Sequence, residues 1–493
     1  MKQLKAQLWI IVALVGVASA QTWVQLAPTG VPPAAWSAAN YDVTNNRLIA
    51  YFQGNPAVNA STSNQVWVLT NANGIGGTPV WSQLSPTGTP PVSNALGTAA
   101  YDAARNRLII YGGCYANCSP ALSDVFVLTN ANGLGGTPVW SQSSVSNPEA
   151  RDGQTAIYDS VTNVMVTFGG GLAFYGTDQN DTRILSNANG VPSPSSWNSL
   201  SLAGPLPGIR ETQTAVYDQA NDRMTLFAGT DLITTCCPYA QSDYNDTWVL
   251  SHATGIGGTP GWTQLTPSGT LPGVRSLHSA VYDSANNRMI VFGGLVWNQA
   301  AQNYTVLGDL WQLTNANGLG GPPAWSQLAP TGTSPGPRAL HNAVFDSANQ
   351  RMIVLDGLGY PGGISTGVWV LAMGPVGPLY NICLLYDPTK AVHSGATVPI
   401  KLQLCDGSGN DLSSSSINVH ATSVTQTSTS ISGTVQDSGT SNPDGDFRFD
   451  STLGTTGGYV FNLKTNGLTT GTYNLNFTVT GDSFVYATPF QVK

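Results

Sequence analysis

Residues 275–294 read RSLHSAVYDSANNRMIVFGG, and residues 309–325 read DLWQLTNANGLGGPPAW. The first stretch holds two apolar runs separated by a polar segment, and the second holds a third run, a glycine-rich connector and a tryptophan that opens a fourth. The runs are short, rich in β-branched and aromatic residues, and bounded by Gly, Pro, Asn or Asp, which is typical of strands joined by tight turns. These residues therefore predict one four-stranded sheet.

The same phrases return in the same order along the chain. The tryptophan recurs at intervals of 57 to 65 residues, at Trp23, Trp81, Trp140, Trp197, Trp262 and Trp325. The first run ends in an aromatic residue and an aspartate, at Tyr41-Asp42, Tyr101-Asp102, Tyr158-Asp159, Tyr217-Asp218, Tyr282-Asp283 and Phe345-Asp346. Repeats of this kind build sheets that stack around a ring. The sequence predicts an all-β chain whose main part is a six-bladed β-propeller.

The phrase order also predicts how the ring closes. The chain opens with a Trp23 strand that has no earlier phrases, and the last repeat ends near Leu371 without a tryptophan strand. We expect the N-terminal strand to complete the sixth blade, which favours six blades over seven. The propeller is expected to span residues 21–373.

Three repeated features resemble kelch repeats over about residues 21 to 373. They are the downstream tryptophan, an Arg-x-x-His before the first run (Arg275 with His278, Arg338 with His341), and a double glycine after the second run (Gly112-Gly113, Gly169-Gly170, Gly293-Gly294). The resemblance implies a kelch-type propeller. Three blades depart from the double glycine, with Gln53-Gly54, Ala228-Gly229 and Asp356-Gly357.

The first twenty residues predict export. Lys2 and Lys5 precede an apolar run from Leu8 to Val17, and Ala18-Ser19-Ala20 matches a signal-peptide cleavage site. An uncleaved anchor is the alternative, but the run is short for a membrane span. We expect residues 1–20 to be a signal peptide, and the mature protein to lack a transmembrane segment and to be secreted, periplasmic or on the cell surface. In that compartment the cysteines are expected to form disulfides, between Cys114 and Cys118, Cys236 and Cys237, and Cys383 and Cys405. The connectivity of the first two pairs stays open.

The last part of the chain has a different composition. After a linker at residues 374–381, the kelch phrases stop and Ser, Thr and Asn dominate. Alternating runs such as Tyr459–Leu463 and Tyr473–Val479 predict strands with one buried face, and residues 382–493 suit an immunoglobulin-like β-sandwich. The segment Gly395–Leu402 resembles the bacterial PxKF-type domain, with Leu402 where that family has phenylalanine. This resemblance implies a spacer or surface module.

Charge and motif content exclude several functions. The net charge is −8, and no lysine lies between Gln21 and Thr389, so a nucleic-acid partner is not expected. Galactose-oxidase-like copper enzymes also use kelch propellers, but His278 and His341 occupy an ordinary repeat position. Repeated positions favour a structural role. We therefore predict no catalytic residue, no metal site and no cofactor.

The loops between second and third runs differ in every blade, and variable loops on a fixed scaffold often carry function. They hold Tyr115, Phe174, Tyr175, Tyr239, Tyr244, Trp297, Tyr304 and Tyr360, with Asp178, Asp231 and Asp243 among them. We expect these loops to share a face with the segments before the first runs, so that they lie near Asp152. The predicted ligand-binding residues are Tyr175, Asp178, Tyr239, Tyr244, Trp297, Arg210, Glu211 and Arg275. Packing of the aromatic residues at the blade ends is the alternative.

The favoured function is a secreted, non-catalytic binding module for an extracellular carbohydrate or protein ligand. Aromatic side chains with scattered acids and amides suit the stacking of sugars or the capture of peptides. Two alternatives remain: a secreted carbohydrate-active enzyme, either galactose-oxidase-like or glycan-cleaving, and a structural surface or matrix protein.

Overall fold

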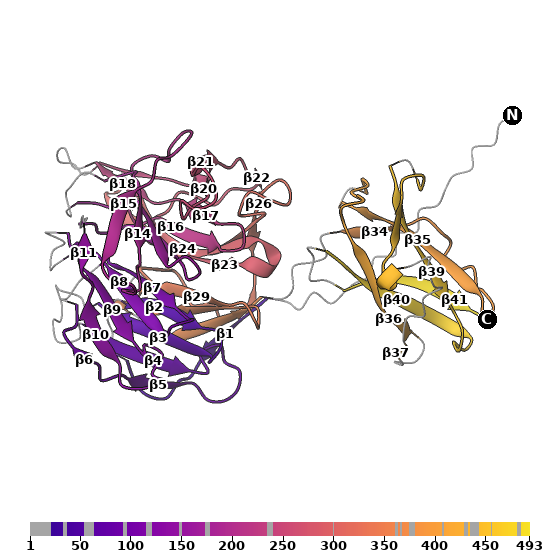
Figure 1. Ribbon diagram of the computed structural model, residues 1–493, viewed down its shortest axis with the longest axis horizontal. Helices are drawn as coiled ribbons and strands as arrows, with labels where there is room; N and C mark the ends of the chain where they lie inside the picture. Colours follow the sequence, from indigo (N-terminus) through magenta and orange to yellow (C-terminus); the bar gives the residue numbers. More distant parts are fainter. Residues whose placement is uncertain are drawn as a thin grey trace. The chain divides into compact units, whose positions relative to one another are not determined.

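The computed structural model describes residues 21–32, 37–53, 64–91, 96–114, 121–146, 150–172, 178–233, 240–298, 300–359, 363–364, 367–373, 380–406, 409–427, 432–433, 443–454, 456–480 and 485–493. The predicted signal peptide lies outside these ranges. Their regular structure is all β, with two short 3-10 turns, η3 (Ser284–Asn286) and η4 (Pro443–Gly445). Across these ranges no helix is long and apolar enough to span a membrane. The chain divides into two compact units, one of Ala20–Met373 and one that contains Gly374–Lys493 (Figure 1).

In the first unit, the described residues form six main sheets whose strands follow the repeated phrases. The first strands are β2 (Ser37–Asp42), β7 (Thr98–Asp102), β12 (Thr155–Asp159), β16 (Thr214–Asp218), β23 (Ser279–Asp283) and β29 (Asn342–Asp346). The second strands are β3 (Arg47–Phe52), β8 (Arg107–Tyr111), β13 (Val164–Phe168), β17 (Arg223–Phe227), β24 (Arg288–Asn298) and β30 (Arg351–Leu355). The third strands are β4 (Gln65–Thr70), β9 (Val125–Thr129), β14 (Thr182–Ser186), β20 (Thr247–Ser251), β25 (Asn303–Thr314) and β33 (Val368–Ala372). The fourth strands are β5 (Val80–Gln83), β10 (Val139–Gln142), β15 (Ser195–Ser199), β21 (Gly261–Gln264), β26 (Ala324–Leu328) and, from the start of the chain, β1 (Thr22–Leu26).

Strand β1 joins the sheet that contains the end of the unit. It pairs antiparallel with β33, from Thr22 opposite Ala372 to Leu26 opposite Val368. Short strands link consecutive sheets by parallel pairing with a fourth strand: β6 (Thr87–Gly88) with β10, β11 (Val145–Ser146) with β15, β22 (Ser268–Gly269) with β26, and β27 (Thr331–Gly332) with β1. The first strands contact one another in the order β2, β7, β12, β16, β23, β29 and back to β2.

Apolar side chains from neighbouring sheets pack together between them. One cluster combines Leu48 and Phe52 of the first sheet with Ile353 and Val370 of the sheet that β1 completes. The repeated tryptophans are buried in these interfaces. Five of them contact an aromatic residue in the second strand of the neighbouring sheet: Trp23 with Phe292, Trp140 with Tyr51, Trp197 with Tyr111, Trp262 with Phe168 and Trp325 with Phe227. The tryptophan periodicity therefore reflects packing between sheets.

A polar contact fixes how neighbouring sheets meet. An asparagine in the connector between third and fourth strands donates a side-chain hydrogen bond to the aspartate that ends the first strand of the neighbouring sheet: Asn73 to Asp346 at 2.6 Å, Asn132 to Asp42 at 2.6 Å, Asn189 to Asp102 at 2.7 Å and Asn317 to Asp218 at 2.6 Å. The arginine that begins the adjacent second strand donates to the backbone carbonyl of the same asparagine: Arg351 to Asn73, Arg47 to Asn132, Arg107 to Asn189 and Arg223 to Asn317. We call this pair of contacts the Asn clamp. It assigns a structural role to the repeated Asp, Arg and connector Asn.

A second set of contacts lies at the other end of the first strands, in the segments that lead into them. In the described part of these segments, five residues have a positive φ: Leu96, Gly153, Thr212, Leu277 and Leu340. Each of the last four donates its backbone N–H to the carbonyl of the one before it, at 2.7–3.1 Å. We call these five residues the backbone girdle. Positive φ is unfavourable for leucine and threonine, so the surrounding hydrogen bonds must hold it. The girdle fixes the residues on either side of it.

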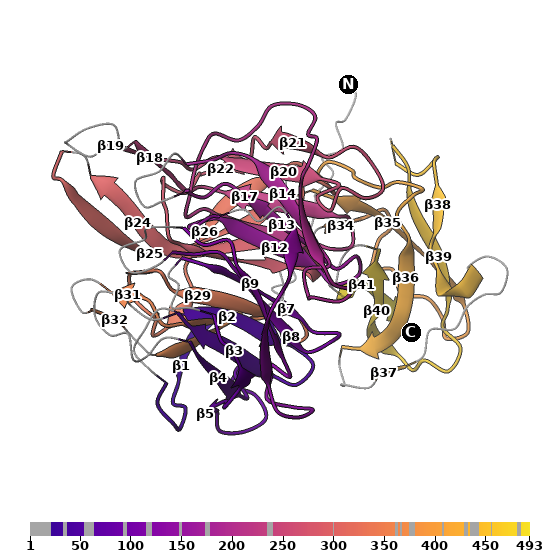
Figure 2. The ribbon, with the colours of Figure 1, turned by 60° about the vertical axis from the view of Figure 1, so that its left-hand side comes forward.

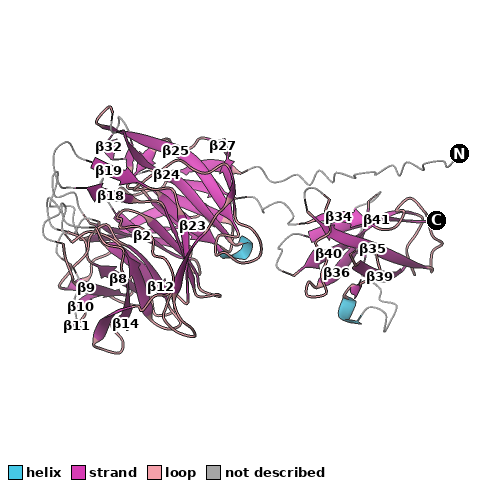
Figure 3. Cartoon of the chain, turned by 90° about the horizontal axis from the view of Figure 1, so that it is seen from above, coloured by secondary structure: helices cyan, strands magenta, loops and turns pink. Residues whose placement is uncertain are grey.

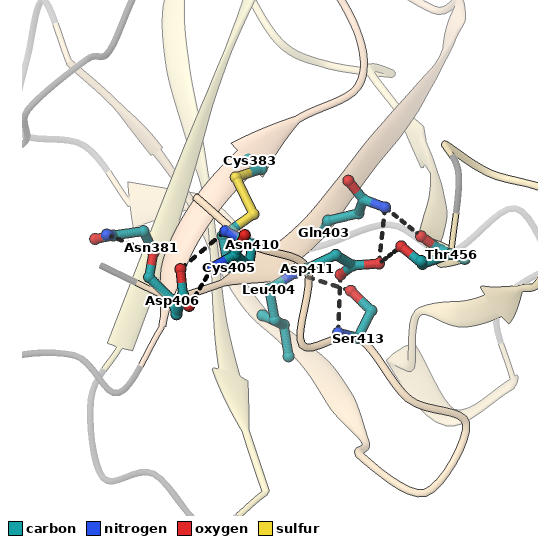
Figure 4. The surroundings of a disulfide bond; sticks show 11 residues. Asn381, Cys383, Gln403, Leu404, Cys405, Asp406, Asn410, Asp411, Ser413 and Thr456 are labelled. Carbon is teal, nitrogen blue, oxygen red and sulfur yellow. Dashed lines mark hydrogen bonds between the residues drawn. A yellow bond between two sulfur atoms is a disulfide. The ribbon is translucent and has the colours of Figure 1, made fainter. Parts of the chain in front are cut away.

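The second unit has two four-stranded sheets among its described residues. One contains β34 (Asn381–Leu384), β35 (Thr397–Cys405), β38 (Arg448–Asp450) and β39 (Gly458–Lys464), and the other contains β36 (Val419–Gln426), β37 (Ser432–Gly433), β40 (Gly471–Val479) and β41 (Val485–Val492). Their alternating apolar residues form one core that includes Ile400, Phe461, Leu475 and Phe477. A disulfide between Cys383 and Cys405 joins β34 to β35, with the two Cα atoms 6.1 Å apart (Figure 4).

Replacing Asn73 by alanine should lower the free energy of unfolding of the first unit by about 1.5–3 kcal/mol, because the buried Asp346 carboxylate loses one of its hydrogen-bond donors, the one that comes from the neighbouring sheet. All tryptophans of residues 21–493 lie before residue 374, so tryptophan fluorescence during urea unfolding reports on this unit alone. The control is Gln83→Ala, at an exposed position of β5, which should change stability by less than about 0.5 kcal/mol. An Asn73→Ala variant as stable as this control would contradict the clamp.

Replacing Cys383 and Cys405 together by serine should destabilise the second unit by about 3 kcal/mol, since the bond closes a loop of sequence separation 22. Differential scanning calorimetry should show an earlier transition for this unit, while the tryptophan-detected transition stays in place. A calorimetric profile identical to that of the unmodified protein would rule out this contribution.

Candidate functional site

The segments that lead into the first strands meet the hairpins between second and third strands. Backbone pairs join Asp152 to Gly171, Glu211 to Thr230 and Ser276 to Leu295. The hairpins include β18 (Thr230–Ile233) with β19 (Ala240–Asp243), the outer parts of β24 and β25, and β31 (Leu358–Gly359) with β32 (Gly363–Ile364), where β31 also pairs with β28 (Arg338–Ala339). These elements gather on one side of the unit, which we call the loop face (Figures 2 and 3).

The arginines in the segments that lead into the first strands, which we call the lead-in arginines, form ion pairs beneath the loop face. Arg210 and Arg275 are 0% and 1% exposed, and each forms a two-pronged ion pair, with Asp246 and Asp309 respectively, at 2.6–2.9 Å. Arg151 also pairs with a carboxylate, since its Nη2 donates to both oxygens of Asp181 at 3.0 and 2.9 Å. Both guanidinium groups of the predicted site are therefore occupied inside the fold, where they hold the lead-in segment to the third strand.

The residue after the lead-in arginine differs between sheets. It is Asp152 or Glu211 in two consecutive sheets, but Ser276 and Ala339 in the next two. Glu211 lies against the girdle residue Gly153, where an added Cβ would come within 3.1 Å of Glu211 Oε2. The charge of Asp178 acts on both Asp152 and Glu211. We call Asp152, Asp178 and Glu211 the carboxyl cluster.

The carboxyl cluster is buried, and burial governs its protonation. Burial, together with the charge of Asp178, raises the pKa of Asp152 to about 7. Burial raises the pKa of Asp178 to about 6, although the N–H of Leu232 donates to its Oδ2 at 2.9 Å. Burial and the charges of Asp178 and Asp152 hold the pKa of Glu211 well above its usual range. Burial therefore favours the protonated, neutral form of the carboxyl groups in this cluster.

Asp178 belongs to a motif that ties one sheet's hairpin to the next. Asp178 accepts from the N–H of Leu232, and Asp243, at the matching position of the next sheet, accepts from the N–H of Trp297 at 2.9 Å. Two residues later, Asn180 and Asn245 donate to the carbonyls of Pro207 and Pro272 at 3.2 and 3.0 Å. These repeated contacts join the segment of Asp178 to the β18–β19 hairpin, and that hairpin to the hairpin of Trp297.

Aromatic side chains lie beside the carboxyl cluster. On the outer part of the β24–β25 hairpin, the rings of Trp297 and Tyr304 pack 4.7 Å apart, and Tyr304 is 49% exposed. Burial and the charges of Asp243 and Glu211 raise the pKa of Tyr304. The charge of Glu211, a member of the carboxyl cluster, therefore acts on the Tyr304 hydroxyl. Tyr244 is half-buried, and the guanidinium of Arg210 lies 4.0 Å from its ring centre.

The structure brings Asp178, Glu211, Tyr244 and Trp297 of the predicted site to the loop face. Tyr175, Tyr239, Cys118, Cys236 and Cys237 lie outside the described residues, and Cys114 is disulfide-bonded. The list of predicted ligand-binding residues did not include Asp152 or Tyr304, although Asp152 was expected near these loops and Tyr304 was among their aromatic residues. A signal for Asp152 was present in the sequence: an acid follows the lead-in arginine in two sheets and not in the next two.

His278 and His341 hold neighbouring sheets together. Their Nε2 atoms lie 2.7 Å from the hydroxyls of Thr214 and Ser279 in the adjoining first strands. Burial first, and nearby charges second, lower the pKa of both imidazoles, that of His341 to about 3. Within the described residues, no group of three or more His, Cys, Asp or Glu side chains is arranged to hold a metal ion.

A hollow of about 300 Å³ lies between the third strand of one sheet and the link to the next. Its walls are formed by Asn180, Asp181, Thr182, Ser199, Leu200, Leu202, Gly204 and Leu206. None of the predicted ligand-binding residues lines it. We therefore place the candidate site at the carboxyl cluster and the Trp297–Tyr304 pair.

Comparison with known proteins identifies the repeats. Residues 191–374 match the family model described as the KLHDC2/KLHL20/DRC7 Kelch-repeats domain. Residues 191–374 therefore carry kelch repeats within an all-β fold of the β-propeller type, which confirms the predicted repeat class for that part of the chain. Over 98 residues, 19% of its length, it is 35% identical to Host cell factor 2 from Homo sapiens. The matched part spans 10% of that protein, so the similarity covers a tenth of this curated relative.

The raised pKa values predict how stability depends on pH. Glu211 binds its proton more tightly in the folded than in the unfolded chain, so its contribution to stability falls as the pH rises from about 4 toward its folded pKa. Glu211→Gln removes this titration. Between pH 5 and pH 8, the variant should gain on the order of 1 kcal/mol relative to the unmodified protein in tryptophan-detected urea unfolding. Parallel pH profiles of the two proteins would show that Glu211 ionises freely.

Proposed function

We propose that this chain is an exported, non-catalytic binding module whose loop face captures a protein ligand. In this proposal the first unit is a six-bladed ring closed by its N-terminal strand. The second unit is an immunoglobulin-like sandwich that acts as a spacer or surface module. Export rests on the signal-peptide pattern of residues 1–20 and agrees with the disulfide between Cys383 and Cys405.

Several contacts support the six-bladed ring. The first strands contact one another in a cycle that returns from β29 to β2. At that junction the Asn clamp joins Asn73 to Asp346, β27 pairs with β1, and Ser37 donates to Asp356 at 2.6 Å. The junction between the start and the end of the unit thus uses the same kinds of contact as the other junctions.

The observation that carries the binding proposal is the Trp297–Tyr304 pair, which lies on a hairpin of the loop face beside Asp152 and Glu211, two acids of the carboxyl cluster that the repeat does not require. Positions that repeat from sheet to sheet serve packing, whereas Asp152 and Glu211 have Ser276 and Ala339 as counterparts. Aromatic side chains at the centre of a contact surface contribute most to the affinity of protein complexes. Kelch repeats generally serve as protein-interaction modules, which favours a protein ligand.

A carbohydrate ligand is the second candidate, since the rings of Trp297 and Tyr304 offer a surface on which a sugar can stack. A glycan-cleaving enzyme is the corresponding catalytic alternative, because the carboxyl cluster combines carboxyl groups of different pKa. Release of reducing ends from a polysaccharide by the purified protein, lost in Asp178→Asn, would favour the enzyme over the binding module.

The test is a peptide and glycan array probed with the purified chain, followed by titration of each ligand found. Trp297→Ala and Tyr304→Ala should each weaken binding by about 1–3 kcal/mol, because each removes aromatic contact area from the loop face. Val161→Ala is the control, at an exposed turn between first and second strands. If both aromatic variants bind as tightly as the control, the ligand does not use the loop face.

A further inference from the structure

We propose that the carboxyl cluster formed by Asp152, Asp178 and Glu211 is a receptor for a primary ammonium group, such as a lysine side chain of the protein ligand. This inference names the chemistry recognised at the site and rests on the proposed function only for the source of the ammonium group.

The cluster lacks a counter-ion in the described part of the chain. The arginines that precede Asp152 and Glu211 form ion pairs with carboxylates outside the cluster, Arg151 with Asp181 and Arg210 with Asp246. No lysine or arginine of the described ranges forms an ion pair with a cluster carboxylate. A buried carboxylate without a cation is costly, so the free protein keeps the cluster partly protonated.

One buried carboxylate oxygen of the cluster has no hydrogen-bond partner among the described residues. Asp152 is 1% exposed, and its Oδ1 has no hydrogen-bond donor. Buried carboxylate oxygens almost always accept a hydrogen bond. The remaining exposure of the cluster lies at Asp178 and Glu211, at 6% and 9%, so a donor that enters from the loop face passes these two carboxyls before it reaches Asp152.

The donor chemistry favours an ammonium group over a guanidinium. An ammonium group is compact and has three N–H donors, so it can donate both to the unpaired Oδ1 of Asp152 and to a neighbouring carboxyl group. A guanidinium is planar and prefers two parallel bonds to one carboxylate, as Arg210 makes with Asp246. The described residues offer a metal ion no group of three or more His, Cys, Asp or Glu ligands.

Binding exchanges a proton for the ammonium group: R–NH₃⁺ enters, and a cluster carboxyl group releases H⁺ to solvent. The raised pKa of Asp152, about 7, places this exchange in the neutral range. The other titratable and charged groups around the cluster are Asp231, Asp243, Asp246, Tyr244, Tyr304 and Arg210. The pKa values of Tyr244 and Tyr304 are raised, so both phenol groups stay neutral between pH 5 and pH 8. Affinity should therefore rise with pH in that window, by up to about tenfold per pH unit for each proton displaced.

The first experiment uses the full chain and n-butylammonium chloride, with binding followed by NMR at constant ionic strength. Saturable binding is expected, with affinity at least tenfold higher at pH 8 than at pH 6 and proton release into a weakly buffered solution. n-Butanol should not bind, and n-propylguanidinium should bind more weakly. Asp152→Asn and Glu211→Gln should each lower the affinity at least tenfold. Asp356→Asn, which removes a different buried carboxyl of raised pKa, should leave it unchanged.

Three results would overturn the receptor: no saturation above the salt control, equal binding by the cluster variants and Asp356→Asn, or affinity that does not change with pH. Melting temperatures of all variants show whether each one folds. Any peptide ligand from the array is then compared in three forms, unmodified, acetylated at lysine and acetylated at the N-terminus, which identifies the source of the ammonium group. If n-butylammonium binds and no protein ligand is found, the receptor stands and the proposed function fails. If a protein ligand needs Trp297 for binding, but the cluster variants bind n-butylammonium as the unmodified protein does, the proposed function stands and the ammonium receptor fails.

Discussion

Neighbouring sheets of the first unit meet through apolar side chains that could also pack after a small shift, and the Asn clamp removes that freedom. Asn132 reaches the carboxylate of Asp42 in the adjoining sheet, and Arg47 reaches back to the carbonyl of Asn132. A buried carboxylate tolerates little change in the position of its donor, since losing that donor costs about 1–3 kcal/mol. The clamp thus converts non-directional packing into a defined angle between sheets. The backbone girdle does the same at the opposite end of the first strands.

The seam that holds the carboxyl cluster is built differently from its neighbours. Where the clamp would need an asparagine, Thr254 stands instead, and its hydroxyl donates to Asp222 of its own sheet at 2.8 Å. Asp159 across the seam accepts from the side chain of Gln219 at 2.8 Å. Near the loop face, the bond from Leu232 to Asp178 holds the same two sheets together. A polar contact that holds this seam together therefore includes Asp178, a member of the candidate site.

The repeat class and the strand phrases could be predicted from sequence, because each phrase is local and recurs six times. The role of the Asp42 and Arg47 positions could not be predicted in full. Within one repeat they look like turn residues, and their partner Asn132 lies in the next repeat. For the same reason, the candidate site could be predicted only in part, because its residues have partners that lie far away in the sequence. Arg210 looks like a surface cation in sequence, but the fold buries it against Asp246. Asp152 and Glu211, 59 residues apart, become neighbours only when consecutive lead-in segments are joined by the girdle.

The pairing of β1 with β33 also determines how the first unit responds to mechanical load. Because Thr22 lies opposite Ala372 and Leu26 opposite Val368, the residues that precede β1 and follow β33 emerge at the same end of the pair. A force that pulls these two flanks apart acts across the strands and breaks their hydrogen bonds one after another. Pairs loaded in this unzipping direction yield at low force, whereas strands pulled along their length must break all bonds at once. The strand pair that joins the two ends of the unit is therefore its weakest point under tension, however stable the unit is toward heat or urea.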